Sequence, residues 1–197
     1  MAWLSFKKGS IPIGAVIVNE TKTRVAGGRS QQYEKAGSPG EIVNHKLSHA
    51  ELNALLKVGK EEHPDVRHYA LYSTMEPCPL CFCAIAMSGI RRIEYAARDG
   101  YAGGVEINRL SGYIAAKKIE VSGPYGEMEA IQLTIQSVFE YRRGPSEKLL
   151  SKWSEDSKAA VDLAKTLFHE GTLLRFAEKD LEMSVVYDFL CGNLKRR

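Results

Sequence analysis

Three side chains with metal-binding chemistry occur in two short motifs, SHAE at residues 48–51 and EPCPLC at residues 76–81. The motifs supply the imidazole of His49 and the thiols of Cys78 and Cys81, a donor set suited to zinc. Three protein ligands leave one position of a tetrahedral zinc ion open, which is the catalytic rather than the structural arrangement. Zinc in such a site lowers the pKa of water from about 15.7 to about 7. The two motifs therefore predict a catalytic zinc site.

Glu51 follows the candidate ligand His49 by two positions and is the candidate general acid and base. Hydrolysis needs a group that carries protons between the water and the leaving group. Another interpretation is a capping box, in which Glu51 and Ser48 satisfy backbone donors at a helix start. A Cys-x-x-Cys pair alone would also fit a redox pair or half of a structural zinc site. The two motifs together, each opening an apolar helix-like segment, favour catalysis over a structural or RNA-binding zinc module.

Length and composition indicate a globular chain of one domain, or of one domain with an appendage. The chain has 197 residues, of which 44% are hydrophobic and 26% charged. Its formal net charge of +3 permits contact with phosphates but is smaller than is typical of nucleic-acid-binding domains. Four cysteines are too few for a disulfide scaffold, and thiolate ligands require a reducing compartment. With no signal peptide or membrane span recognisable, we expect a cytoplasmic protein with no membrane contact.

Hydrophobic patterns predict alternating strands and helices over residues 1–143. Strands are expected at 11–18, 23–26, 69–74, 92–97 and 118–122, and helices at 49–57, 78–88, 110–116 and 126–143. A helical crossover between the last two strands makes them parallel. This succession predicts an α/β fold, a three-layer α/β/α sandwich with a central mixed five-stranded sheet.

Several residues carry more specific expectations. Leu52, Leu55 and Leu56 should form the buried face of the helix that begins at His49. The helix over 126–143 should have one buried stripe, formed by Met128, Ile131, Ile135, Val138 and Phe139. Pro77 should occupy the first turn of the next helix, and Gly89 should end it. Cys83 should be a buried packing residue and not a metal ligand, because on a helix its side chain points in a different direction from that of Cys81. His45 should be a solvated residue of the long loop over 29–47, which leads to the metal ligand and could face the substrate.

The strand pattern stops at Gly144-Pro145, and residues 146–197 contain helical signals alone. Helices are expected near 155–169 and 181–191, with Ser154 and Asp180 as N-caps and Gly171 and Gly192 as stops. We therefore divide the chain into a unit at 1–143, which contains both zinc motifs, and a C-terminal helical extension at 144–197. The extension should lie outside the catalytic core and either cover that core or form a subunit contact.

Residues 11 to about 143 resemble the cytidine deaminase-like superfamily of zinc-dependent base and nucleoside deaminases. The resemblance is greatest to the branch of tRNA adenosine deaminases and guanine deaminases, and H-x-E followed by P-C-x-x-C is the signature of such enzymes. The segments that carry the resemblance are 11–18, 49–51, 71–81, 90–99 and the basic helix end at 139–143.

The resemblance implies a Zn2+-dependent hydrolase that releases ammonia from the exocyclic amine of an aminopurine or cytosine-type base or nucleoside. His49, Cys78 and Cys81 would hold the metal and Glu51 would move protons, while the backbone N–H of Ala50 and the backbone carbonyl of Glu76 would hold the substrate. The alternative is a tRNA adenosine deaminase that makes inosine in an anticodon loop, with Arg91, Arg92, Arg142 and Arg143 contacting RNA. We expect a homodimer.

Two positions depart from the family pattern. The family usually has asparagine in a Gly-x-Asn motif after the second strand, where this chain has Gly28-Arg29-Ser30. Ser30, the candidate substrate-binding residue at this position, offers a hydroxyl in place of an amide. About ten residues precede the first strand, where the family usually has a full helix.

Overall fold

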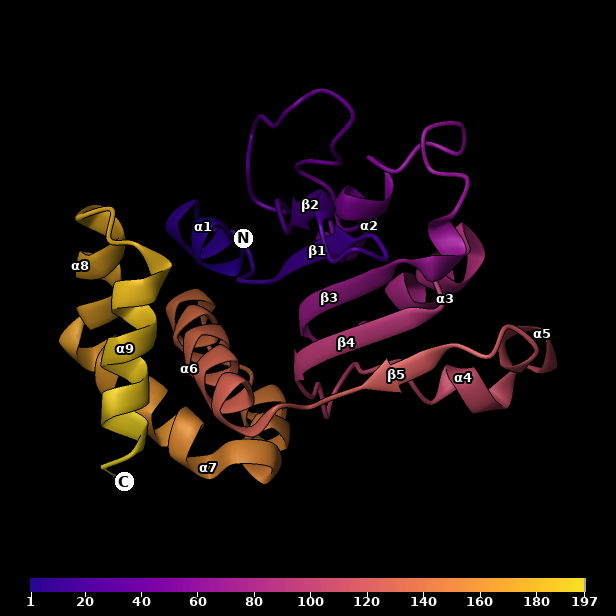
Figure 1. Ribbon diagram of the computed structural model, residues 1–197. Helices are drawn as coiled ribbons and strands as arrows, with labels where there is room; N and C mark the ends of the chain where they lie inside the picture. Colours follow the sequence, from indigo (N-terminus) through magenta and orange to yellow (C-terminus); the bar gives the residue numbers. More distant parts are fainter. Residues whose placement is uncertain (197) are drawn as a thin grey trace.

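A mixed five-stranded sheet is the centre of the computed structural model, which describes residues 1–196 (Figure 1). Its strands are β1 (Gly14–Val18), β2 (Arg24–Arg29), β3 (Ala70–Met75), β4 (Arg92–Ala97) and β5 (Glu120–Ser122), in the spatial order β2-β1-β3-β4-β5. The β1 strand is antiparallel to β2 and β3, whereas β3, β4 and β5 are parallel. The predicted mixed sheet and the parallel pairing of its last two strands are confirmed.

One face of the sheet is covered by α2 (Ala50–Leu55) and α3 (Pro79–Ser88). Ile17, Leu71 and Ile93 point from the strands into this layer and contact Phe82 and Ile85 of α3. A 3-10 turn (Val66–His68) and two single-turn helices, α4 (Ile107–Leu110) and α5 (Gly112–Ala115), complete this side of the molecule. The helix expected over 110–116 is thus two short helices, interrupted at Ser111, which caps the second one.

Helices α1 (Ala2–Lys7) and α6 (Gly126–Arg143) lie on the other side and cover that face in part. The strand residues that alternate with the buried ones, such as Val16, Tyr72 and Glu94, line an open groove with Tyr125 and Met128. Met128 is exposed there, although the helix pattern predicted it on the buried stripe of α6. The remaining members of that stripe are buried as predicted: Ile131, Ile135, Val138 and Phe139.

The buried face of α2 differs from the one predicted. Ala50, Glu51, Asn53 and Ala54 are buried, whereas Leu56 is exposed and Leu52 and Leu55 are half-buried. The reason is the close approach of α2 to β2: a Cβ atom at Gly28 would lie 2.1 Å from the carbonyl oxygen of Ala50. At this separation the interface admits small side chains, and the leucines turn outward.

The start of α3 lies one residue later than predicted. Cys78 is the N-cap and Pro79, not Pro77, is the first helical residue, where its missing N–H leaves no helical hydrogen bond unmade. Gly89 ends the helix in the left-handed conformation, with φ 104°, as predicted. Cys83 is half-buried rather than buried.

The C-terminal residues form α7 (Glu147–Glu170), α8 (Thr172–Glu178) and α9 (Met183–Leu194). Helix α7 begins after Ser146, whose hydroxyl accepts the Leu149 N–H, so the expected cap at Ser154 lies inside the helix. Ser157 is non-helical (φ −151°, ψ 91°) and kinks α7. Gly171 ends α7 as predicted.

Helix α9 disagrees with the prediction at both ends. Its N-cap is Glu182, not Asp180, and it continues through Gly192, which was expected to stop it. Glycine costs a helix about 1 kcal/mol relative to alanine. Burial of Val186 and Leu190 against the other helices stabilises α9 by more than this amount.

The three C-terminal helices pack on α6 and α1. Leu163 and Leu167 of α7 and Leu190 of α9 share a buried cluster with Ile135 and Val138 of α6. The division of the chain at 143/144 remains a prediction, since packing of this kind occurs both within and between domains. Among the described residues, no helix combines the length and the apolar character that crossing a membrane requires.

Candidate active site

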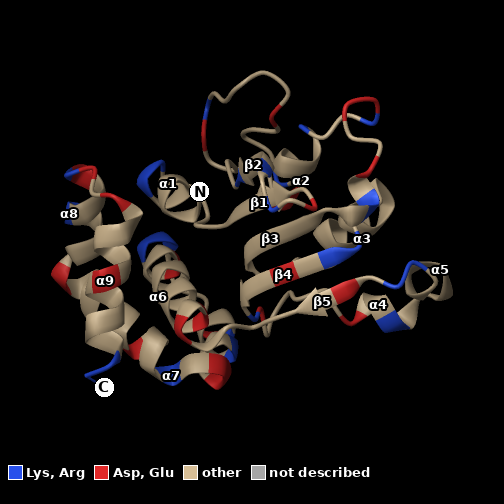
Figure 2. Cartoon of the chain, in the orientation of Figure 1, with Lys and Arg blue, Asp and Glu red and all other residues tan. Residues whose placement is uncertain are grey.

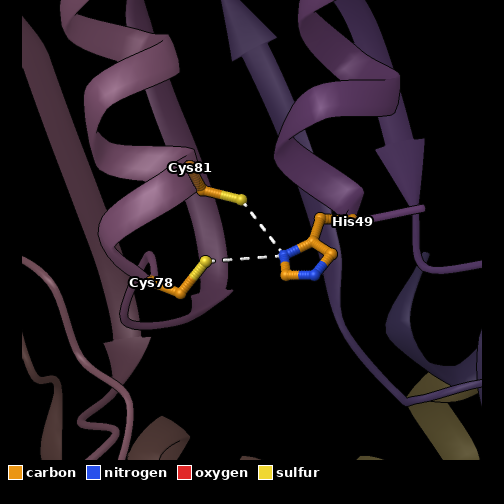
Figure 3. Close-up of side chains that lie close together, drawn as sticks. All are labelled: His49, Cys78 and Cys81. Atoms are coloured by element: carbon orange, nitrogen blue, oxygen red, sulfur yellow. Dashed lines mark hydrogen bonds between the residues drawn. The ribbon is translucent and has the colours of Figure 1, made fainter. Parts of the chain in front are cut away.

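The N-termini of α2 and α3 bring the three predicted metal ligands together (Figure 3). His49 is the N-cap of α2, Cys78 is the N-cap of α3, and Cys81 lies in the first turn of α3. The Nδ1 atom of His49 lies 3.5 Å from the sulfur of Cys78 and 3.3 Å from that of Cys81. All three donor atoms are within 4.8 Å of one another.

This geometry fits a tetrahedral zinc ion. With Zn–S bonds near 2.3 Å and Zn–N bonds near 2.1 Å, tetrahedral angles place nitrogen and sulfur about 3.6 Å apart. The two nitrogen–sulfur distances are close to this value, so the ligands need little rearrangement to hold the metal. A hydrogen bond between the imidazole and the backbone of Lys46 supports the ring, as is usual for a histidine that binds a metal.

The charges of the three ligands depend on one another. The hydrogen bond from Cys81 and the interaction with His49 lower the pKa of the Cys78 thiol to about 4. The same hydrogen bond and burial raise the pKa of Cys81, while the Cys78 thiolate raises the pKa of His49. One thiolate is therefore formed readily, and a dication is needed to hold the second.

Glu51 is 3% exposed and lies beside the metal ligands, where its side chain hydrogen-bonds with Cys81. The three-ligand cluster itself consists of His49, Cys78 and Cys81. Its carboxylate accepts a hydrogen bond of 3.1 Å from the Ser73 hydroxyl. The capping box is absent, because the Ser48 hydroxyl donates to the Ile42 carbonyl and accepts the Gln31 N–H instead. Burial raises the pKa of Glu51, which suits a group that must both take up and release protons.

A cavity of about 130 Å3 opens over the metal ligands. It brings together every residue expected from the sequence to contact metal or substrate except Cys81, which is buried behind it: Ser30, His49, Ala50, Glu51, Glu76 and Cys78. Ile11, Ile13, Gln32, Asp99 and Ala102 complete its wall. The cavity is thus built from five separate parts of the chain, including the start of the long loop after β2.

Ser30 has an unusual environment within this wall. Its side chain is buried, yet its hydroxyl has no hydrogen-bond partner anywhere in residues 1–196. Its backbone groups are bonded, to the Ile13 carbonyl and the Ser5 hydroxyl, which fixes the residue in place. A buried hydroxyl without a partner is costly, and a polar group of a bound substrate would satisfy it.

Sequence reasoning missed the residues that hold these groups in position. Asn53 binds the long loop to α2, because its amide donates to the carbonyls of Arg29 and Ile42 and accepts the Ile42 N–H. Asn53 follows His49 by four positions and so lies on the same face of the helix, and this spacing could have indicated a role near the site. Ser73 and Asp99 gave no such signal, since each acts on a residue that is more than twenty positions away. His45 is exposed in the loop, as expected.

Comparison with known proteins places this cavity in context. A family model described as the cytidine and deoxycytidylate deaminase zinc-binding region matches residues 1–97. The chain is 34% identical to the tRNA-specific adenosine deaminase of Rickettsia bellii over 108 residues, which cover 54% of this chain and 70% of that protein. It is 33% identical to a probable cytosine deaminase of Schizosaccharomyces pombe, over 63% of this chain and 77% of that one. A solved tRNA:A34 deaminase, 31% identical, aligns with a TM-score of 0.44 over 53% of this chain and 75% of its own.

Replacement of a ligand tests the assignment of the metal site. We expect the wild-type chain to contain about one zinc ion, and Cys78→Ala or Cys81→Ala to abolish its binding, because two ligands hold zinc poorly. Cys83→Ala is the matched control and should leave the zinc content unchanged. Metal analysis of the three purified variants gives the answer, and full zinc in either ligand variant would refute the assignment.

Proposed function

Because the chain belongs to the cytidine deaminase-like superfamily of zinc-dependent deaminases, we propose that it hydrolyses the exocyclic amine of a free base or nucleoside and releases ammonia. The observation that carries this proposal is the buried carboxylate of Glu51 beside a three-ligand zinc site. A structural or RNA-binding zinc module does not need a carboxylate that is held apart from the metal. This arrangement therefore favours catalysis over a zinc module.

The proposed mechanism assigns a proton-transfer role to Glu51. Zinc held by His49, Cys78 and Cys81 would act as a Lewis acid and lower the pKa of water. Glu51 takes one proton from the attacking water and passes it to a ring nitrogen of the substrate, while the water oxygen bonds to the ring carbon. It then moves the second proton from the new hydroxyl to the amine, the C–N bond breaks, and ammonia leaves a carbonyl on the ring. The Ser73 hydroxyl donates to one oxygen of this carboxylate and so holds the side chain in place.

Backbone groups and one hydroxyl are proposed to hold the substrate. Ala50 lies in the first turn of α2, where helical N–H groups have no partner within the helix, and it lines the cavity. The backbone carbonyl of Glu76 would accept a hydrogen bond from the substrate's amine. The free hydroxyl of Ser30 would bind a polar group further along the substrate.

A tRNA substrate is the second candidate, because several relatives are tRNA-specific adenosine deaminases. The basic residues give it limited support. Figure 2 shows basic and acidic residues interspersed along the elements. Two of the candidate RNA contacts are engaged within the protein. Arg91 donates to the carbonyls of Gly89 and Ile90, and the Arg143 guanidinium lies 4.0 Å from the centre of the Tyr33 ring. We therefore rank a small base or nucleoside first.

The protein is further proposed to form a homodimer through α3. Leu80 and Met87 are 43% and 62% exposed and lie two turns apart on the outer side of this helix. Cys83 and Ala84, between them, are half-buried, so the four residues form one apolar stripe. A second copy that presents the same stripe would cover it in a symmetric contact.

Thiolate metal ligands favour a reducing compartment, which for this protein we propose to be the cytoplasm.

A Glu51→Gln variant tests catalysis. It keeps the size of the side chain but removes the group that shuttles protons, so we expect turnover to fall by roughly 10²- to 10⁴-fold while zinc content and melting temperature stay near wild type. The substrate comes from a panel of amino-bearing bases, nucleosides and transcribed tRNAs assayed for ammonia. Near-wild-type turnover would sink the assignment, and ammonia release from tRNA alone would favour the second candidate.

A Ser30→Ala variant tests the substrate contact. Removal of a buried hydroxyl without a partner should leave stability unchanged or slightly higher. Loss of one neutral hydrogen bond to the substrate should raise KM by about 3- to 10-fold. Steady-state kinetics and thermal unfolding of the same preparation measure both effects. An unchanged KM would refute the substrate contact, and a clear loss of stability would show that the hydroxyl serves the fold.

A Met87→Glu variant tests the proposed dimer. Two carboxylates would face each other across the α3 contact, so we expect the molar mass from light scattering after gel filtration to halve. Val185→Glu on α9, also at an exposed apolar residue, should keep the wild-type mass. A monomeric wild-type chain, or a dimer that persists in the Met87→Glu variant, would rule out this interface.

A further inference from the structure

The segment over residues 98–105, here called the wall segment, lies directly against the turn that carries Glu76 and Cys78. The N–H groups of Asp99 and Val105 donate to the two oxygens of the Glu76 carboxylate, and the Gly104 N–H donates to the Pro77 carbonyl. A Cβ atom at Gly104 would lie 2.5 Å from the backbone nitrogen of Pro79, so no side chain fits between the two layers. Asp99 and Ala102 of this segment line the cavity.

The first half of α7, residues 147–156, covers the outer side of the wall segment. The indole N–H of Trp153 donates to the Asp99 carboxylate over 3.3 Å. The same carboxylate oxygen accepts the N–H groups of Tyr101 and Ala102, so it sets the turn of the wall segment. Further contacts join the two elements: Arg98 with Asp156, Lys148 over the Tyr101 ring, and the close approach of Gly100 to Lys152.

The kink at Ser157 separates this half of α7 from the other. Beyond the kink, Leu163, Ala164 and Leu167 pack with α6 and α9. Before it, Leu150 and Trp153 pack with Met75 and Ala97, the last residues of β3 and β4. These strand ends lead directly into Glu76 and the wall segment. A helix in the C-terminal extension thus contacts both parts of the chain that form this side of the cavity.

We propose that Trp153 is a positioning residue for the deamination reaction, and that the first half of α7 holds the wall segment against the substrate cavity. Trp153 does not line the cavity and acts through Asp99 and Glu76. The proposal rests on the proposed function, since it concerns substrate binding at that site. It also makes residues 147–156 necessary for substrate recognition, although they lie outside residues 1–143, which contain both zinc motifs.

The test compares two tryptophan-to-phenylalanine variants of the full, zinc-loaded chain. Trp153→Phe keeps an aromatic ring in the core and removes the N–H that binds Asp99. Trp3→Phe is the matched control. Trp3 is similarly buried, in the cluster that α1 forms with α6 and the C-terminal helices, and its indole N–H donates to the Leu181 carbonyl. We expect kcat/KM to fall about tenfold in Trp153→Phe, mostly through a higher KM, and to stay near wild type in Trp3→Phe.

Hydrogen exchange provides a readout that does not depend on activity. In Trp153→Phe, amides of residues 98–105 should exchange faster than in Trp3→Phe, whereas the peptide over 76–81 keeps its zinc and its protection. If the wild-type chain deaminates nothing, the proposed function fails, but faster exchange confined to 98–105 still establishes that Trp153 holds the wall segment. Unchanged exchange there, or equal kinetic losses in the two variants, would overturn the proposal.

A double variant examines the route through Asp99. If Trp153 acts through that carboxylate, adding Trp153→Phe to Asp99→Ala, which removes the acceptor oxygen, should lower kcat/KM by much less than tenfold. Independent, multiplying losses would show that Trp153 contributes through core packing alone. Melting temperatures of all four proteins separate a general loss of stability from a change confined to the cavity.

Discussion

The close contact between α2 and β2 is the constraint on which the site depends. Gly28 lets the backbone of α2 approach the sheet until the carbonyl of Ala50 occupies the space of a side chain. This contact fixes where α2 begins, and therefore where the His49 imidazole lies relative to the two thiols of α3. The same contact excludes large residues from the inner face of α2, which leaves room there for the polar pair Glu51 and Asn53.

The metal ligands and the sheet could be predicted from sequence because their signals are local. Residue type and short spacing identify the ligands His49, Cys78 and Cys81, and runs of β-branched residues identify the strands. The groups that support them could not be predicted. Ser73 contacts Glu51 and Trp153 contacts Asp99 across 22 and 54 positions of the chain, and no periodicity in the sequence records such pairs.

Helix ends were predicted less well, for a related reason. The start of α7 was misplaced because its first turns are largely polar, and it is the burial of Leu150 and Trp153 that makes them helical. Helix α9 continues through Gly192 because packing of its apolar side outweighs the local preference of glycine. In each case a tertiary contact overrides the intrinsic propensity of the segment.

The placement of the ligands has a consequence for how the chain acquires its parts during synthesis. His49 and Cys81 are 32 positions apart, a loop whose closure costs little entropy, and β1, β2 and β3 precede Cys81 in sequence. Helix α7 is translated much later, at about 5–20 residues per second. A nascent chain therefore holds its complete metal-binding set several seconds before the helix that braces the substrate wall exists. The order of the chain thus puts the metal ligands ahead of the helix that braces the wall segment during synthesis.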